Sequence, residues 1–116
     1  MKLRINGNSI RLRLTKNEVA DLVHHGNTTS SCHIGTEALV YSLVHINQDS
    51  ISAELKPGKV IVTLPTSLVK NWDIDERVGF DYKTDDGLYV LVEKDFTCLT
   101  PRDHEDESNL YPNPLA

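Results

Sequence analysis

KLRINGNSIRLRL, residues 2–14, alternates apolar and polar side chains on both sides of the pair Gly7-Asn8. Alternation with a period of two residues around a Gly-Asn turn is typical of a β-hairpin. Every second residue points to the same face of a strand, so one face of this hairpin is apolar. The other face is predicted to be solvent-exposed and basic, and its cations are Lys2, Arg4, Arg11 and Arg13.

A helix is predicted over residues 16–25. Thr15 precedes Glu18 by three residues, which is the spacing of a capping box. Val19 and two further apolar residues follow at helical spacing, and Gly26 is a typical helix stop. A polar loop over residues 27–31 is then expected to lead to a long apolar strand that ends near Val44.

The same order of elements recurs in the second half of the chain. Residues 51–64 form another predicted hairpin around Pro57-Gly58, and a short helix follows over residues 66–72. A last hairpin turns at residues 85–87. An offset of 50 residues places Val60 on Ile10, and an offset of 48 places Tyr89 on Tyr41. Duplication would explain this match, as would the hydrophobic register that any two ββαββ segments share.

The predicted fold is therefore a single α+β domain over residues 1–100. It consists of two ββαββ halves, residues 1–46 and 51–93, related by a pseudo-two-fold axis. We expect a mostly antiparallel sheet or flattened barrel of about eight strands with two short helices, because each half must bury an apolar face. The predicted core residues are Leu12, Leu14, Val19, Leu22, Leu43, Val60, Val62, Leu64, Val69, Trp72, Val90 and Val92.

Residues 101–116 are predicted to be an acidic, proline-containing C-terminal extension. Its acidic cluster, residues 103–107, is opposite in charge to residues 1–16, which hold five cations and no acid. One expectation is that the extension lies against the body of the protein, and the alternative is a disordered acidic tail that aids solubility. Isolated surface ion pairs contribute little free energy, so this docking requires Tyr111 to bury its ring.

Composition narrows the class of protein. The net charge of −5 argues against a generic nucleic-acid binder, because such proteins are usually basic. No apolar run reaches the roughly 20 residues needed to cross a bilayer, and the N-terminus lacks the apolar core of a signal peptide. We therefore expect a cytoplasmic protein with no membrane partner, in which Cys32 and Cys98 are reduced thiols.

The basic face of the first hairpin is the candidate ligand-binding site. Lys2, Arg4, Arg11 and Arg13 lie within cross-strand reach of one another, and guanidinium groups bind phosphate or carboxylate in a bidentate manner. The alternative is a solvated face that pairs with acids on neighbouring strands, such as Glu37, Glu54 or Glu93. Arginines that point into a cavity would favour the anion site.

No motif identifies a catalytic site, a metal site or a cofactor. The group His24, His25, Cys32 and His33 lacks the paired short spacings of a structural zinc site. Cys98 has no neighbouring base, and neither a nucleophile elbow, a phosphate loop nor a dinucleotide fingerprint is present. The pair Asp85-Asp86 fits a turn.

The chain as a whole resembles an uncharacterised family of small bacterial proteins, a domain of unknown function. The resemblance rests on residues 2–5, 7–15, 18–19, 92–96, 98–99, 105–108 and 112–114. It implies a bacterial cytosolic protein and no particular activity.

Residues 60–92 also resemble the swapped-hairpin unit of AbrB/MazE-type regulators and antitoxins. The resemblance rests on residues 62–65, Leu68, Trp72, residues 74–75 and 78–80, with Glu76-Arg77 in place of the usual Gly-Asp turn. Those proteins combine two such units in a dimer, and this chain would hold both in one polypeptide.

Three functions follow from these observations. We expect a non-enzymatic binding or interaction protein whose partner is another protein or a small anion. The first alternative is an anion-binding protein or phosphate-ester enzyme that uses Arg4, Arg11 and Arg13. The second is a DNA-binding regulator of the swapped-hairpin kind, whose affinity would fall as salt rises.

Overall fold

A computed structural model describes residues 1–96 and 111–112 of the chain. The predictions for Cys98 and for the acidic cluster at residues 103–107 lie outside the described residues. The elements in chain order are β1 (Lys2–Asn6), β2 (Ser9–Leu14), α1 (Lys16–His25), β3 (Asn27–Ile34), β4 (Glu37–Ile46), β5 (Ser52–Lys56), β6 (Lys59–Pro65), α2 (Thr66–Val69), β7 (Gly79–Lys83) and β8 (Tyr89–Lys94).

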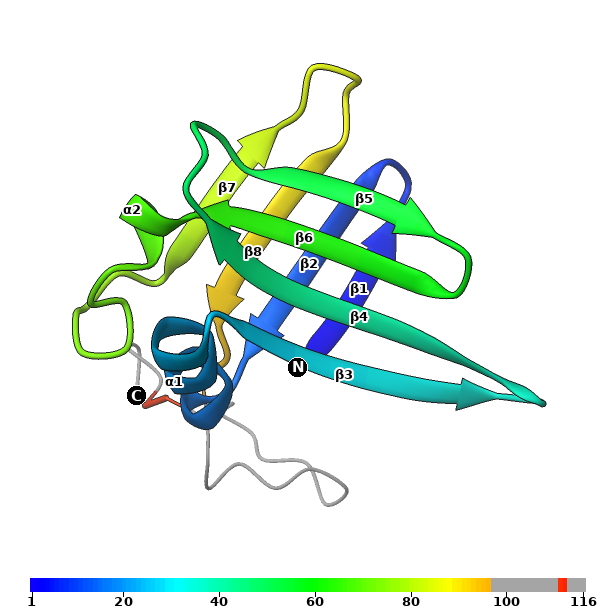
Figure 1. Cartoon of the computed structure of the whole chain (residues 1–116), viewed down its shortest axis with the longest axis horizontal. Coiled ribbons are helices and arrows are strands. Elements are labelled where there is room, and N and C mark those ends of the chain that lie inside the picture. Colours follow the sequence, from blue (N-terminus) through cyan, green and yellow to red (C-terminus); the bar gives the residue numbers. More distant parts are fainter. Residues whose placement is uncertain (97–110, 113–116) are drawn as a thin grey trace.

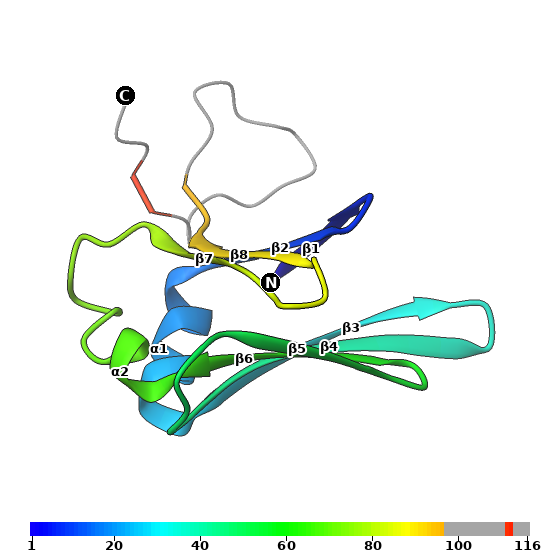
Figure 2. The ribbon, with the colours of Figure 1, turned by 90° about the horizontal axis from the view of Figure 1, so that it is seen from above.

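The strands form two four-stranded sheets, which pack as two layers (Figures 1 and 2). Sheet A has the order β1-β2-β8-β7, and sheet B has the order β3-β4-β6-β5. In each sheet the two central strands are parallel and the outer pairs are antiparallel. The predicted α+β class is confirmed, with two packed sheets and two helices at one end of them (Figure 2).

The two halves have the same strand order. Each strand of the first half has an equivalent four strands later, so β1 corresponds to β5 and β4 to β8. Exchanging equivalent strands converts the order of sheet A into that of sheet B. Each sheet therefore combines the first hairpin of one half with the last hairpin of the other half. The predicted two-half architecture is confirmed at the level of strand order and pairing.

One predicted register is wrong by a single residue. Ile10 pairs with Val90, whereas its equivalent Val60 pairs with Tyr41, so Tyr41 corresponds to Val90 at an offset of 49. The predicted offset of 48 matched Tyr41 to Tyr89 because both are tyrosines. A slip of one residue changes the face of a strand, and Tyr89 lies on the face opposite to Val90.

Helix α1 begins and ends where the sequence predicts. Thr15 Oγ1 accepts a hydrogen bond from the Glu18 N–H (3.4 Å), and Glu18 Oε1 accepts one from the Thr15 N–H (2.9 Å). Gly26 ends the helix with a φ of 89°, a conformation that glycine adopts without strain. Helix α2 is shorter than predicted, because turns replace the helix between Val69 and Trp72. No helix within the described ranges is long and apolar enough to span a membrane.

The polar loop expected over residues 27–31 is wrong, because this segment belongs to strand β3. Thr28 is buried against the core, and Thr29 Oγ1 lies 2.9 Å from Ser42 Oγ on β4. β-branched threonines fit a strand, and the hydroxyl pair between Thr29 and Ser42 satisfies polar groups there.

The core lies between the sheets and under the helices. All twelve predicted core residues are buried, together with Ile10 and Ile51. Trp72 is fully buried, its ring packs on Phe80 at 4.8 Å between centroids, and its Nε1 donates a hydrogen bond to the Arg77 carbonyl (2.8 Å). The first hairpin buries Leu12 and Leu14 in this core, which fixes the direction of its basic face.

Candidate functional site

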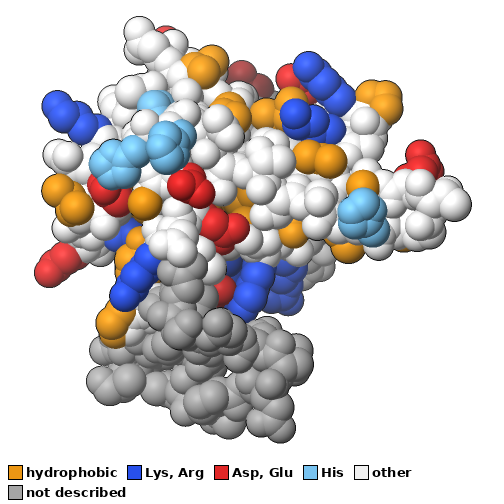
Figure 3. Space-filling view, turned by 60° about the horizontal axis from the view of Figure 1, so that its bottom comes forward, with side chains coloured by type: hydrophobic (Ala, Val, Ile, Leu, Met, Phe, Trp, Pro, Cys, Tyr) orange, Lys and Arg blue, Asp and Glu red, His pale blue; other side chains and the backbone are white. Residues whose placement is uncertain are grey.

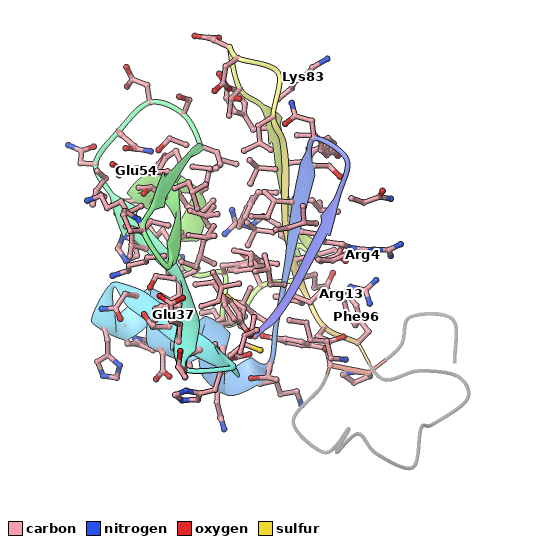
Figure 4. The ribbon with its side chains drawn as sticks, turned by 90° about the vertical axis from the view of Figure 1, so that its right-hand side faces the viewer. Arg4, Arg13, Glu37, Glu54, Lys83 and Phe96 are labelled. Atoms are coloured by element: carbon pink, nitrogen blue, oxygen red, sulfur yellow. The ribbon has the colours of Figure 1, made fainter. Side chains whose placement is uncertain are left out.

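The basic face of the first hairpin is the outer face of sheet A, on the side away from sheet B. The pairing places Lys2 opposite Arg13 and Arg4 opposite Arg11, so all four cations share one face. Figure 4 shows Arg4 and Arg13 pointing away from sheet B. We call these four residues the arginine face. They do not point into a cavity between the sheets.

Glu93 on β8 is the carboxylate that meets this face. Its Oε1 accepts hydrogen bonds from Arg11 Nε (2.6 Å) and Arg13 Nε (2.9 Å), and it also contacts Arg11 Nη2. The Glu93 side chain is only 14% exposed. Of the acids considered from the sequence, Glu37 and Glu54 belong to sheet B instead (Figure 4). One carboxylate thus bridges two guanidinium groups, and among the described residues the cations of this face outnumber its acids.

Lys2 is held at the end of the arginine face that lies nearest the helices. Its Nζ lies 3.1 Å from Oδ2 of Asp95, a buried residue that follows β8. The Asp95 N–H donates to the Leu14 carbonyl (2.8 Å), which extends the contact between β8 and β2. Lys2 therefore has a structural partner at its own end of the sheet.

Arg4 differs from its neighbours. It is exposed, and none of the described residues forms a hydrogen bond or ion pair with its guanidinium group. Beside it lies a surface cavity of about 330 Å³. Its lining includes Arg4, Asn6, Ser9, Arg11, Tyr89 and Leu91.

The two hydroxyl groups of this cavity are already engaged. The Ser9 hydroxyl donates to the Asn6 carbonyl (2.7 Å), and the Tyr89 hydroxyl donates to Asp81 Oδ2 (2.8 Å). The hydrogen bond to Asp81 raises the pKa of Tyr89, since ionisation would break it. The described lining of the cavity therefore offers positive charge from Arg4 and Arg11 and an apolar side chain from Leu91.

The histidine and cysteine group does not converge. His24 Nε2 lies 2.8 Å from Asp73 Oδ2, His25 pairs with Asp21 one helical turn away, and Cys32 and His33 lie on β3. Figure 3 shows histidine side chains at separate places on the surface. No group of three or more histidines, cysteines or acids within the described ranges could hold a metal ion.

A second group of polar and aromatic residues surrounds Lys94, and the sequence pattern did not lead us to predict it. Lys94 is 4% exposed, and its Nζ donates to the Asp75 carbonyl (2.7 Å). The same Nζ lies 5.8 Å from the ring centroid of Trp72 and 5.0 Å from that of Tyr111. Burial lowers the pKa of Lys94. The alternation of β8 would have predicted this burial, because Lys94 follows Val90 and Val92 at every second position and so points inward.

Tyr111 lies against the body of the protein. Its N–H donates to the Asp95 carbonyl (2.9 Å), and its half-buried ring packs 5.8 Å from the ring of Phe96. Lys16 lies 5.8 Å from the Tyr111 ring centroid, on the side of α1. Tyr111 thus lies beside the Lys2 end of the arginine face, where Asp95 contacts both Lys2 and Tyr111.

Comparison with known proteins identifies the family. The model of a family of unknown function, DUF7009, matches residues 1–115. The chain belongs to this family, which confirms the resemblance to an uncharacterised domain. No curated protein and no solved structure matches the chain.

Proposed function

We propose that this chain is a non-enzymatic binding protein whose arginine face holds a carboxylate or phosphate group of its partner. The imbalance of charge on that face carries the proposal. Among the described residues, Arg11 and Arg13 share the carboxylate of Glu93, and Arg4 has no anion. A ligand anion would supply the missing charge.

The placement of Arg4 and Arg11 suits such a group. The two residues oppose each other on neighbouring antiparallel strands, where Cβ atoms lie about 4.5–5.5 Å apart. Guanidinium groups bind the oxygens of carboxylate and phosphate through paired N–H donors. The cavity beside them leaves room for the body of the ligand, and Leu91 offers it apolar contact.

Binding is favoured over catalysis because the described lining residues include no carboxyl group, histidine or lysine that could act as a general acid or base. The Ser9 and Tyr89 hydroxyls already donate to protein acceptors, and guanidinium groups stay protonated near neutral pH, so they do not act as general bases. For location we propose the cytoplasm of a bacterium, on the sequence grounds given above.

Titration with sodium phosphate and with sodium acetate at constant ionic strength tests the proposal. We expect NMR shifts confined to the side-chain Nε–Hε groups of Arg4 and Arg11 and to the amides of β1 and β2. Arg4→Gln should abolish them, since it removes the charge that has no described partner. Lys83→Gln is the matched control, because Lys83 is exposed on β7 at the other edge of the same sheet.

Uniform small shifts at every lysine and arginine would overturn the proposal, as would equal shifts in the Arg4→Gln variant. A response to phosphate alone, or to acetate alone, would assign the ligand to one of the two anion classes.

DNA binding is a second candidate, favoured by one observation. Each sheet combines a hairpin from one half with a hairpin from the other, which is the exchange implied by the resemblance to swapped-hairpin regulators. Fluorescence anisotropy with duplex DNA tests this function. The logarithm of the affinity should fall linearly with the logarithm of the salt concentration. An affinity that does not change with salt concentration, or no binding at low salt, would exclude DNA binding.

A further inference from the structure

Strand β1 lies at an edge of sheet A (Figures 1 and 2). Among the described strands, only β2 pairs with it. An edge strand presents backbone N–H and C=O groups that can pair with another extended chain. Charged side chains on an edge discourage unselective pairing, and β1 carries Lys2 and Arg4.

The two faces of β1 differ in chemistry. Lys2 and Arg4 point outward on the arginine face, whereas Leu3 and Ile5 pair with the core residues Leu12 and Ile10 and point inward. Ile5 is nevertheless 63% exposed. The reason is visible in Figure 2, where the two sheets diverge towards the turn between β1 and β2.

A cavity of about 450 Å³ lies where the sheets diverge. Its apolar lining comes from the tips of both halves: Ile5, Ile10, Ala53, Leu55, Val60 and Leu88. Two acids, Glu54 and Asp86, also line it, so it suits the apolar side chains of a partner and not the acidic ones. Ile5 and Leu55 occupy equivalent positions in the two halves, and Leu55 is 79% exposed. An apolar side chain placed beside Ile5 would lose its contact with water here.

We propose that β1 accepts an extended segment of a partner protein by strand addition, and that this segment alternates acidic and apolar residues. The inference rests on the proposed function and names its anion as a glutamate or aspartate of the partner. The acidic side chains lie over Arg4 on the outer face, and the apolar side chains enter the cavity beside Ile5. Main-chain pairing supplies affinity, and the alternating side chains supply specificity.

Charge selects β1 over the other three edges. Strand β5, the equivalent of β1 in sheet B, has Glu54 where β1 has Arg4. Strand β7 has Asp81 on its outer face, and β3 has only uncharged hydroxyl side chains, such as Thr29 and Ser31, at its centre. The outer faces of β5 and β7 each combine one acid with one lysine, Glu54 with Lys56 and Asp81 with Lys83. Strand β1 has two cations, Lys2 and Arg4, and no acid, so an acidic segment fits β1 best among the described edge strands.

The test uses the full chain and a fluorescently labelled peptide of alternating valine and glutamate. Two further peptides serve as comparisons: one alternates valine and lysine, and the other has the valine–glutamate composition in two blocks. We expect the alternating acidic peptide to bind at least about tenfold more tightly than either. Its amide shifts and slowed hydrogen exchange should concentrate on β1.

Two variants with matched controls locate the contact. Arg4→Glu should weaken binding about tenfold through lost charge pairing, while Lys83→Glu on the opposite edge should leave it unchanged. Ile5→Ser should weaken binding through lost apolar contact, while Ile74→Ser, at another exposed apolar residue, should not. Arg4 has no described partner, so its variant should fold, and thermal melting verifies this.

Shifts centred on β3, β5 or β7, or equal binding of the block peptide, would overturn strand addition at β1. The phosphate titration separates the two proposals. Local phosphate shifts at Arg4 and Arg11 without peptide binding contradict only the strand addition. The proposed function is itself contradicted if phosphate causes no local shifts and the peptide binds the Arg4→Glu variant as tightly as the wild type.

Discussion

Arg4 and Arg11 lie directly opposite each other on β1 and β2, yet only Arg11 has a carboxylate partner among the described residues. The cause is the strand order of sheet A. Glu93 lies on β8, which adjoins β2 but not β1. We therefore expect the stability of this face to depend on Glu93, and the proposed binding of an external anion to depend on Arg4.

Glu93→Gln should lower the free energy of unfolding by about 1–3 kcal/mol, because it removes charged hydrogen bonds to Arg11 and Arg13. Repulsion among the arginines then remains. Salt at 1 M shortens the screening length to about 3 Å, so the loss should shrink there. Urea unfolding at low and high salt measures both effects. Glu54→Gln, at an exposed position, should stay within about 0.5 kcal/mol of the wild type. Equal midpoints for Glu93→Gln and the wild type would contradict the bridging role.

Trp72→Ala should cost about 3–5 kcal/mol of unfolding free energy, because the ring is fully buried against Phe80. The variant also loses the hydrogen bond to the Arg77 carbonyl. Ile74→Ala, two residues later and 79% exposed, is the control and should change stability little. Urea unfolding compares the two variants, and a loss below about 1 kcal/mol for Trp72→Ala would mean that the ring contributes little to the core.

The sequence predicts the core well, because alternation and helical spacing are local signals. Leu12, Leu14 and Val19 were assigned correctly from their neighbours alone. The parallel pairing of β2 with β8 has no such signal, since it joins residues 80 positions apart such as Arg13 and Glu93. Duplication is still one of two explanations for the matching strand order, and the other is the hydrophobic pattern that any two ββαββ segments share.

Polar residues in strands were the main source of error. The stretch around Thr28 and Thr29 has the composition of a loop, and only its place beside β4 makes it a strand. At the candidate site, alternation placed the four cations on one face, but the outward direction depends on the packing of sheet A on sheet B. Lys94 was missed because a lysine at the end of a strand is usually exposed.

Lys94 should make stability depend on pH in the alkaline range. The unfolded amine titrates near 10.5, and burial lowers the pKa in the folded state. Between the two values the unfolded state binds more protons, so stability rises with pH, by at most about 1.4 kcal/mol per pH unit. Relative to Lys94→Met, the wild type should therefore gain stability as pH rises towards 10.5. Urea unfolding of both proteins from neutral to alkaline pH measures this, and a constant difference would contradict it.

Tyr111→Ala should lower the free energy of unfolding by about 1–3 kcal/mol, because the ring packs on Phe96 and lies near the amines of Lys16 and Lys94. Deleting residues 103–116 should cost at least as much, since it removes Tyr111. Acids at residues 103–107 that attract the arginine face would make the deletion costlier at low salt than at high salt. Melting temperatures under both conditions separate the apolar contribution from the charge contribution.

A shorter truncation provides the control for this anchor. Removing residues 113–116 retains Tyr111 and its N–H bond to the Asp95 carbonyl, so this variant should melt close to the full chain. Asp95 also pairs with Lys2, so loss of Tyr111 should change the environment of the arginine face as well as that of Lys94. The NMR shifts of the Lys2 and Arg13 amides report this coupling. Unchanged melting of Tyr111→Ala and of the longer deletion, at both salt concentrations, would mean that the extension adds nothing to the stability of the fold.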